Sequence, residues 1–456
     1  MDDWNQAEQR VELAQRLYET GDFSKAAREL RSAIAVNPYN PSWHFNLALT
    51  LDALGDYAHA VAAYRRALEL EPDDVEVING LGVDQTRLGH YRDALDCFER
   101  IEKLDPSFEP AYCNRIVTYS EMGDHESAEL MFYLARQIKD ECPLCLYNLA
   151  NSLYERQQFG KAIACWESVL KLDPEHCDVH ARLAESHWSL GEFAKARECY
   201  IAQLREEPGD YETLLDLGEL LLEMGELDDA GEKFRRVLEQ APEHVGAHFG
   251  LAELAFKRDQ MDIAEKQLRL VLRLDKHYPG VHQKLGEVLL RKGKLTVAGV
   301  HLLAELRQPG QDAESLMELG QLLLEARKFR QANEALRKLV ALEPENAAAH
   351  HSLAVSYFLM HDLDAGIRHC RRALKHRPNY ALALYNLSLA HMQKGQMSRA
   401  RRYASRAIVA APTDKNIHTL AAQLGLNGFW QSVKAALRHP LHNLARRFRH
   451  GGPDKA

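Results

Sequence analysis

A glycine recurs at multiples of 34 residues along this chain, and this period restricts the fold more than any other feature of the sequence. The glycines in this phase are Gly21, Gly55, Gly89, Gly123, Gly191, Gly225, Gly293 and Gly395. An alanine follows each of them by five positions, as Ala60 follows Gly55, and prolines such as Pro38 and Pro72 share the frame. Twelve 34-residue units fit positions 7–414 without an insertion. Such a sustained period predicts a repeat architecture.

The residues of unit 41–74 predict a pair of packed helices. Apolar residues recur at helical spacing on both sides of Gly55. Gly55 can adopt the left-handed conformation that ends a first helix, Asp56 can start a second helix, and Pro72 ends it. Each helical pair has an apolar face that it cannot bury alone, so neighbouring pairs must stack and share one core.

Eight positions of this unit match a known pattern, and they are Leu47, Ala48, Gly55, Tyr57, Ala60, Tyr64, Ala67 and Pro72. Through them the chain resembles the tetratricopeptide repeat family over about nine-tenths of its length. The resemblance implies an all-α fold, a right-handed superhelical solenoid of about twelve helix-turn-helix repeats. It also implies a non-enzymatic scaffold or adaptor that binds proteins or peptides.

The remaining segments complete the expected organisation of the chain. Residues 1–6 form a lead-in to the tandem repeats of 7–414. Residues 415–426 read as a capping helix that covers the exposed end of the stack. Residues 427–456 form a basic amphipathic tail.

Some units depart from the repeat pattern. Arg115 stands where a leucine is expected, Asp140 replaces a closing proline, and Asp259 replaces a loop glycine. Gln203 and Glu305 occupy positions that are usually small and buried. These residues are either hinges or partner sites, or the result of neutral drift in a long array, and the sequence leaves both interpretations open.

A row of acidic and aromatic residues marks a candidate binding groove. The resemblance implies that the first helix of each unit lines a concave groove, and its central inward position holds Glu185, Glu219, Glu253 and Glu287 in four consecutive units. The aromatic residues beside them are Tyr147, Tyr154, Trp188, Phe249 and Phe256. Aligned carboxylates and aromatic rings favour a basic protein or peptide segment. The alternative is that glutamate is simply a good helix former on a solvated face.

The charge of the chain is divided between its two ends. Residues 347–456 carry a balance of +13, whereas residues 1–346 carry −22. The candidate basic surface consists of Arg371, Arg402, Lys434, Arg438, Arg446 and Arg447. The tail could pack on the last repeat, bind an anionic membrane surface, or dock into the acidic groove of the same or another copy.

These readings give two alternatives to a soluble adaptor. One is a peripheral membrane assembly factor tethered by the basic tail, and the other is a self-associating scaffold. The acidic remainder of the chain would repel nucleic acid, so we expect no nucleic-acid partner.

The sequence lacks the motifs of common enzymes. It has no glycine-rich phosphate loop, no His-Glu-x-x-His and no nucleophile elbow, so we expect neither catalysis nor a cofactor. Cys142 and Cys145 form a single C-x-x-C, with His176, Cys177 and His180 one unit later. Without a second such pair we expect no metal site.

Other features bear on location and packing. Eight scattered cysteines fit a reducing compartment in which thiols stay free. The chain shows no long apolar run and no secretory signal at its start. We therefore expect a cytoplasmic protein, or a peripheral membrane protein under the alternative hypothesis. One repeat position holds five histidines, which indicates packing, and they are His44, His180, His248, His282 and His350.

Overall fold

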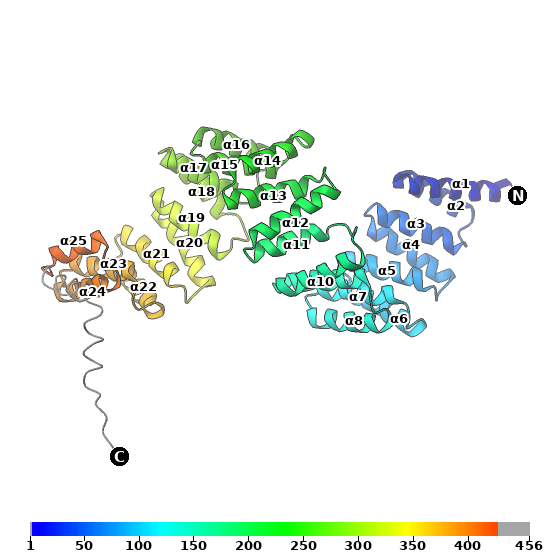
Figure 1. The fold of residues 1–456 in the computed structure, drawn as a ribbon, viewed down its shortest axis with the longest axis horizontal. Coiled ribbons are helices and arrows are strands. Elements are labelled where there is room, and N and C mark those ends of the chain that lie inside the picture. The colour runs from blue at the N-terminus through cyan, green and yellow to red at the C-terminus, as the bar shows by residue number, and fades with distance from the viewer. Residues whose placement is uncertain (1, 427–456) are drawn as a thin grey trace, which may run out of the picture. The chain divides into compact units, whose positions relative to one another are not determined.

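The computed structural model describes residues 2–426, and every regular element in this range is a helix. The helices form two compact units, Met1–Glu226 and Leu227–Ala456. Figure 1 shows that the helices of each unit follow one another in chain order. The all-helical array of helix-turn-helix repeats that the sequence predicts is confirmed.

The helices of the first unit are α1 (Asp2–Glu19), α2 (Phe23–Val36), α3 (Pro41–Ala53), α4 (Tyr57–Leu70), α5 (Val75–Arg87), α6 (Tyr91–Leu104), α7 (Glu109–Glu121), α8 (His125–Ile138), α9 (Pro143–Glu155), α10 (Phe159–Leu172), α11 (Val179–Ser189), α12 (Phe193–Glu206) and α13 (Tyr211–Met224). Those of the second unit are α14 (Leu227–Gln240), α15 (Val245–Lys257), α16 (Met261–Leu274), α17 (Val281–Arg291), α18 (Leu295–Leu306), α19 (Ala313–Glu325), α20 (Phe329–Leu342), α21 (Ala347–Leu359), α22 (Leu363–His376), α23 (Ala381–Gln393), α24 (Met397–Ala410) and α25 (Lys415–Gln423).

The turn inside each repeat is set by a residue in the left-handed conformation. Gly55 has φ of +76° and follows the end of α3. The Gly55 N–H donates to the Asp52 carbonyl at 2.8 Å, and the Asp56 N–H donates to the Leu51 carbonyl at 2.9 Å. These bonds satisfy carbonyls that the helix end would leave unpaired. The prediction that Gly55 ends the first helix is confirmed, whereas the Asp56 carboxylate contacts His59 and makes no side-chain cap bond.

Four repeats lack a glycine at this position and nevertheless have the same backbone. The residues are Gln157, Asp259, Arg327 and His361, with φ of +59°, +59°, +56° and +64°. A left-handed conformation costs a residue with a Cβ roughly 1–2 kcal/mol. The packing of the two helices of the repeat therefore imposes the turn where the sequence does not favour it.

The core alternates small and large side chains, as the repeat pattern predicts. Ala48, Ala60 and Ala67 are buried where helices approach closely, and Tyr64 fills the space between them. The Tyr64 ring packs on Gly80 of the next first helix, where an added Cβ would lie 2.7 Å from the ring. Each repeat thus completes the core of its neighbour.

The recurrent histidines do serve packing. In three repeats the ring Nε2 donates to the carbonyl of the proline six residues earlier, at about 3 Å, in the pairs His44–Pro38, His248–Pro242 and His350–Pro344. This bond satisfies a carbonyl in the turn that joins one repeat to the next. His180 lies 3.5 Å from Glu206 instead, and His282 lies 3.0 Å from His301.

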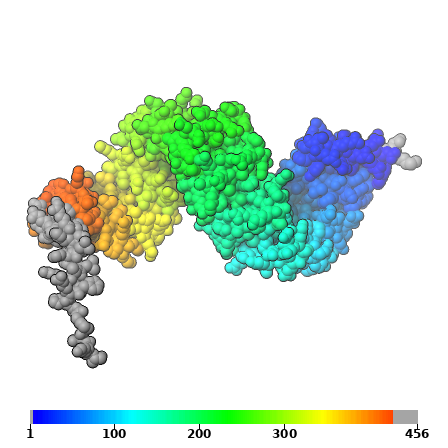
Figure 2. Space-filling model, in the orientation of Figure 1, coloured from blue at the N-terminus to red at the C-terminus, as the bar shows by residue number. Residues whose placement is uncertain are grey.

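Neighbouring first helices are also joined by side-chain bonds between residues 35 positions apart. Asn114 Nδ2 donates to Asn79 Oδ1 at 2.9 Å, and Gln283 Nε2 donates to Glu318 Oε2 at 2.7 Å. In the space-filling view of Figure 2, each stretch of chain lies beside the stretches that precede and follow it within its unit. These bonds therefore help to fix the position of each repeat against the next, as in other stacked arrays.

Two of the residues that depart from the repeat pattern, Arg115 and Glu305, form local hydrogen bonds. Buried Arg115 donates to Glu102 Oε2 at 2.7 Å. The buried Glu305 carboxylate accepts from the Gln283 N–H at 3.2 Å. Gln203 is buried with its side-chain oxygen unpaired among the described residues. A role of these residues as hinges or partner sites stays a prediction.

At the last described repeat, α25 packs on α24 through Ile417, Leu420 and Ala421, which are all buried. Within residues 2–426, no helix is both long enough and apolar enough to span a bilayer.

Candidate functional site

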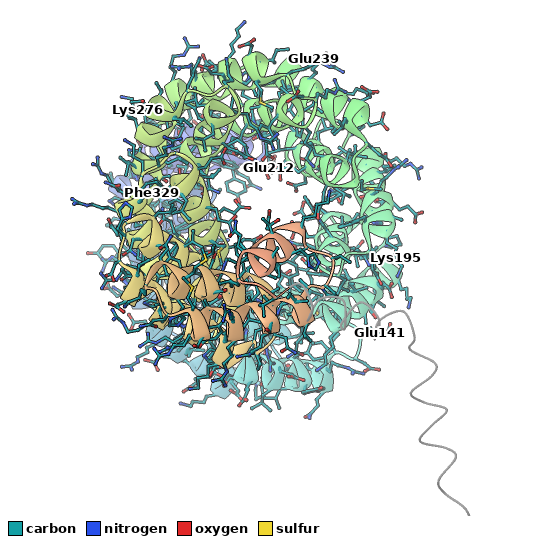
Figure 3. The ribbon with its side chains drawn as sticks, turned by 90° about the vertical axis from the view of Figure 1, so that its left-hand side faces the viewer. Glu141, Lys195, Glu212, Glu239, Lys276 and Phe329 are labelled. Atoms are coloured by element: carbon teal, nitrogen blue, oxygen red, sulfur yellow. A yellow bond between two sulfur atoms is a disulfide. The ribbon has the colours of Figure 1, made fainter. Side chains whose placement is uncertain are left out.

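In the first unit, the predicted groove residues lie on three successive first helices. Tyr147 and Tyr154 lie on α9, Glu185 and Trp188 on α11, and Glu219 on α13. Figure 3 shows Glu212, at the start of α13, toward the inside of the stack, and Lys195, on the second helix α12, on the outside. Residues of α9, α11 and α13 line one hollow, so these three first helices share a face there.

A hollow of about 560 Å³ opens on this face. Its aromatic lining is Tyr154, Trp188, Phe193 and Tyr200, and its carboxylates are Glu185, Asp216 and Glu223. The Trp188 indole N–H donates to Glu223 Oε2 at 2.7 Å, which holds the ring across two neighbouring repeats. The hollow thus combines fixed aromatic surface with three acidic side chains.

The hollow is electrostatically negative. Burial, and after it the nearby charges of Glu219 and Glu185, raise the pKa of Asp216 to about 7. The pKa of Tyr200 is also raised by burial and by Asp216. Arg182 donates to Glu185 Oε2 at 3.0 Å and offsets part of this charge. The raised pKa of Asp216 therefore reflects its partly buried position first and the neighbouring carboxylates second.

In the second unit, the predicted carboxylates already have a cationic partner. Glu253 lies on α15 and Glu287 on α17, and Lys284 Nζ lies 3.5 Å from the first and 3.1 Å from the second. The same ammonium group lies 5.1 Å from the centre of the Phe256 ring. Phe249 packs against Tyr278. This group therefore resembles an acidic, aromatic site whose cation comes from the chain itself.

The sequence did not single out Asp216, Glu223 or Lys284. Asp216 lies one turn before Glu219 on α13, and Glu223 lies 35 residues after Trp188. Aligning the repeats and comparing each residue with the one about 35 positions later would have indicated the Trp188–Glu223 pair. Lys284 could not be found in this way, because its long side chain reaches the two glutamates from a neighbouring position.

The predicted basic surface lies partly outside the described residues. Arg371, on α22, and Arg402, on α24, are exposed. The other members, Lys434, Arg438, Arg446 and Arg447, lie beyond residue 426 and outside the described residues. The membrane and self-association hypotheses therefore stay predictions.

A cluster of cysteines lies between α7 and α9. Cys113 and Cys145 form a disulfide, so the prediction that the thiols stay free is wrong for this pair. Cys142 and Glu109 lie beside it, and one ligand atom from each of these four residues falls within 4.8 Å of the others. The cluster does not include the residues that the sequence suggested as partners of Cys142, since His176 stacks on Tyr147, Cys177 is exposed and His180 pairs with Glu206.

The stacked helical hairpins define an α-helical repeat protein. Two family models, both described as tetratricopeptide repeat, match the chain, one at residues 11–75, 147–211 and 317–359 and the other at 221–286 and 357–424. The chain belongs to the tetratricopeptide repeat family. It is therefore, in general terms, a protein–protein interaction scaffold of a fold that is generally non-enzymatic.

Several solved structures are similar to this chain. Yeast Tom70 is 15% identical, with 98% of this chain and 99% of that chain covered and a TM-score of 0.40. A chain of the APC/C hetero-tetramer Cut9–Hcn1 is 17% identical, with 90% and 95% covered and a TM-score of 0.43. A tetratricopeptide repeat protein from Parabacteroides merdae is 20% identical, with 54% and 98% covered and a TM-score of 0.48. No curated protein matches the chain.

Proposed function

We propose that this scaffold binds a basic segment of a protein partner in the hollow of the first unit. The observation that carries the proposal is the convergence of Glu185, Asp216 and Glu223 on a hollow with an aromatic wall. A lysine or arginine side chain there would gain from all three carboxylates and from the Trp188 ring. Burial and the charges of Glu219 and Glu185 raise the pKa of Asp216 to about 7, and a cation beside this carboxyl group would stabilise its ionised form.

A contact within the second unit resembles the contact that we expect between the partner and the first unit. Lys284 lies between Glu253 and Glu287 and against Phe256, in the arrangement that an incoming lysine would find beside Glu185, Asp216 and Trp188. Lys284 contacts both predicted carboxylates of the second unit, whereas in the first unit Arg182 contacts Glu185, so the second unit is not the proposed binding site. An internal cation there also gives the experiment a matched control.

The proposal is tested by selecting peptides from a random library on the full chain and measuring their affinity for two double variants. We expect the selected peptides to contain lysine or arginine and to bind the Glu185→Gln/Glu223→Gln variant at least tenfold more weakly than wild type. The Glu253→Gln/Glu287→Gln variant should retain nearly wild-type affinity, because Lys284 already neutralises those carboxylates.

Selection of neutral or acidic peptides would contradict the proposal, and so would equal affinity of the wild type and the first variant. A similar loss in both variants would indicate a general effect of the acidic surface rather than a site in the hollow. Affinity that falls as salt rises is expected in any case, because charged groups form the site.

A tether through the basic tail remains an alternative proposal for the same scaffold. It is supported by the excess of basic residues in 347–456 and by the exposure of Arg371 and Arg402. Flotation with vesicles of anionic lipid at low salt tests it. A protein that stays at the bottom of the gradient would rule the tether out.

A further inference from the structure

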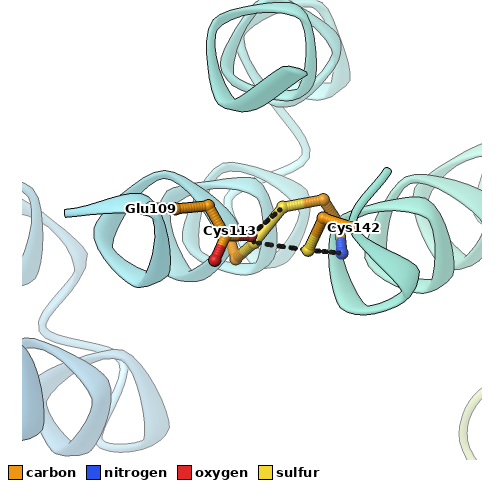
Figure 4. Close-up of side chains that lie close together, drawn as sticks. Glu109, Cys113 and Cys142 are labelled. Atoms are coloured by element: carbon orange, nitrogen blue, oxygen red, sulfur yellow. Dashed lines mark hydrogen bonds between the residues drawn. A yellow bond between two sulfur atoms is a disulfide. The ribbon is translucent and has the colours of Figure 1, made fainter. Parts of the chain in front are cut away.

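We propose that Glu109, Cys113, Cys142 and Cys145 form a four-coordinate zinc site, which is available when the Cys113–Cys145 disulfide is reduced. Figure 4 shows the carboxylate and the sulfur atoms gathered between the start of α7 and the turn before α9. This inference goes beyond the binding of a partner and does not depend on it.

The distances between the ligand atoms suit tetrahedral zinc. With Zn–S bonds of about 2.3 Å, two thiolates on one zinc ion lie about 3.8 Å apart, and a thiolate and a carboxylate oxygen lie about 3.5 Å apart. Cys142 Sγ lies 3.7 Å from Cys113 Sγ, and Glu109 Oε1 lies 3.0 Å from Cys113 Sγ and 3.3 Å from Cys145 Sγ. Three of the six edges of the tetrahedron are therefore close to these values, the disulfide pair must separate, and the remaining two distances are at most 4.8 Å.

A disulfide alone does not explain the arrangement. A disulfide needs two cysteines, whereas the sulfur of Cys142 and a carboxylate oxygen of Glu109 also lie within 4.8 Å of the disulfide sulfur atoms. The cysteines are nearly fully buried, with exposed fractions of 0% for Cys113, 6% for Cys142 and 1% for Cys145. Three buried sulfur ligands favour zinc over a hard cation such as magnesium or calcium, which prefers oxygen ligands.

The backbone donates one hydrogen bond to the sulfur atom of Cys142. Cys142 is the N-cap residue of α9, and its Sγ accepts a hydrogen bond from the Cys145 N–H at 3.3 Å. The positive end of the α9 dipole points at the same sulfur. Asp140 replaces the usual closing proline of unit 109–142, and the turn that follows it places Cys142 beside Cys113 of α7.

A hollow opens beside Cys142 and Cys145 at the edge of the cluster. A hollow of about 360 Å³ is lined by Cys142 and Cys145, together with Arg136, Lys171 and other residues of α8 to α10. A dithiol reductant and a zinc ion could both enter by this path. Reduction transfers two electrons, so that the reductant's two thiols become a disulfide while Cys113 and Cys145 each gain a hydrogen. Zinc then displaces one proton from each of the three thiols and binds the Glu109 carboxylate.

The bound ion would join two repeats. Glu109 and Cys113 lie on α7, and Cys142 and Cys145 belong to the turn and first residues of α9. Either the disulfide or the zinc ion therefore fixes α9 against α7, and the two states exclude each other because they use the same sulfur atoms.

Zinc binding is measured on the full chain after reduction with a dithiol, removal of the reductant without oxygen, and equilibration with zinc alone. Bound zinc is counted by mass spectrometry of the metal, and cobalt is added to a parallel sample to detect thiolate-to-cobalt charge-transfer absorption. We expect about one zinc per reduced chain, none per oxidised chain, and the same charge-transfer signal in wild type and the Cys177→Ser control, whose cysteine lies outside the cluster.

Two variants test the ligand set. Cys142→Ser leaves the disulfide pair intact and supplies a good N-cap residue, so it should fold and lose zinc affinity at least a hundredfold. Glu109→Gln should lose affinity about 10–100-fold and retain the thiolate signal. The proposal is overturned if the reduced wild type binds no zinc, if the oxidised chain binds as well as the reduced chain, or if Cys142→Ser binds like wild type.

Discussion

Replacement of Asp216 with asparagine tests the electrostatic description of the hollow in the first unit. The pKa of Asp216 is raised from 3.8 to about 7 by burial and then by Glu219 and Glu185. Between about pH 4 and pH 7 the folded state therefore binds a proton that the unfolded state does not. Stability from this group is present below about pH 4 and is lost as the pH rises through 7.

The size of the effect follows from the shift. Each pH unit is worth about 1.4 kcal/mol, so a shift of about three units gives an upper limit of about 4 kcal/mol. Because Asp216 is only partly buried, we expect Asp216→Asn to stabilise the first unit by about 2–4 kcal/mol at pH 8. The difference from wild type should shrink toward zero near pH 4.

Local hydrogen exchange in α13 at several pH values measures this stability without assuming that the whole array unfolds at once. The matched control is Glu198→Gln, which removes an exposed charge from α12 and should change exchange in α13 little. If the stability gained by Asp216→Asn does not depend on pH, or is below about 0.5 kcal/mol at pH 8, the account of Asp216 is refuted.

The same proton links stability to binding. At pH 7 about half of the Asp216 side chains carry a proton, so a cationic ligand that lowers the pKa should release about half a proton per site. Calorimetry in two buffers of different ionisation enthalpy measures this release. Peptide binding without proton release would show that the cation does not contact Asp216.

Three further predictions follow from the repeats. Gln157→Gly should stabilise its repeat by about 0.5–1 kcal/mol, because Gln157 has φ of +59°, and Gly55→Gln should cost a similar amount; both are measured by local hydrogen exchange. Burial lowers the pKa values of His351 and His369 to about 4, so the second unit should lose about 2–3 kcal/mol per histidine as the pH falls from 6.5 to 4, and His369→Gln should flatten the measured pH profile. Trp166→Ala should cost about 3–5 kcal/mol in denaturant unfolding of the first unit, because its ring is fully buried; a cost below 1 kcal/mol would contradict the packing.

The repeat frame predicted most of the fold. Each loop glycine in phase, such as Gly55, lies at a turn with positive φ, and the alternation of Ala60 and Tyr64 places small and large side chains as the structure has them. The frame also applies where its usual residue is missing, at Gln157 and Arg327. There the positions of two packed helices outweigh the preference of one residue.

The sites were harder to predict, because they depend on side chains from different repeats. A reading of inward positions found Glu185 and Trp188 but treated all four glutamates alike, and only the structure shows that Lys284 neutralises Glu253 and Glu287. Similarly, the candidate partners of Cys142 in the sequence, His176, Cys177 and His180, belong to the following repeat. The partner atoms lie one repeat backward, on Glu109 and Cys113.

The bonds between residues 35 positions apart have a consequence for synthesis on the ribosome. Asn79 meets Asn114, and Gln283 meets Glu318, after about one further repeat of chain has been added. Contacts between residues of such small sequence separation form quickly, since little chain entropy is lost in closing each loop. Each repeat can therefore dock while translation continues, and the growing chain hides its apolar surface stepwise instead of exposing it until release.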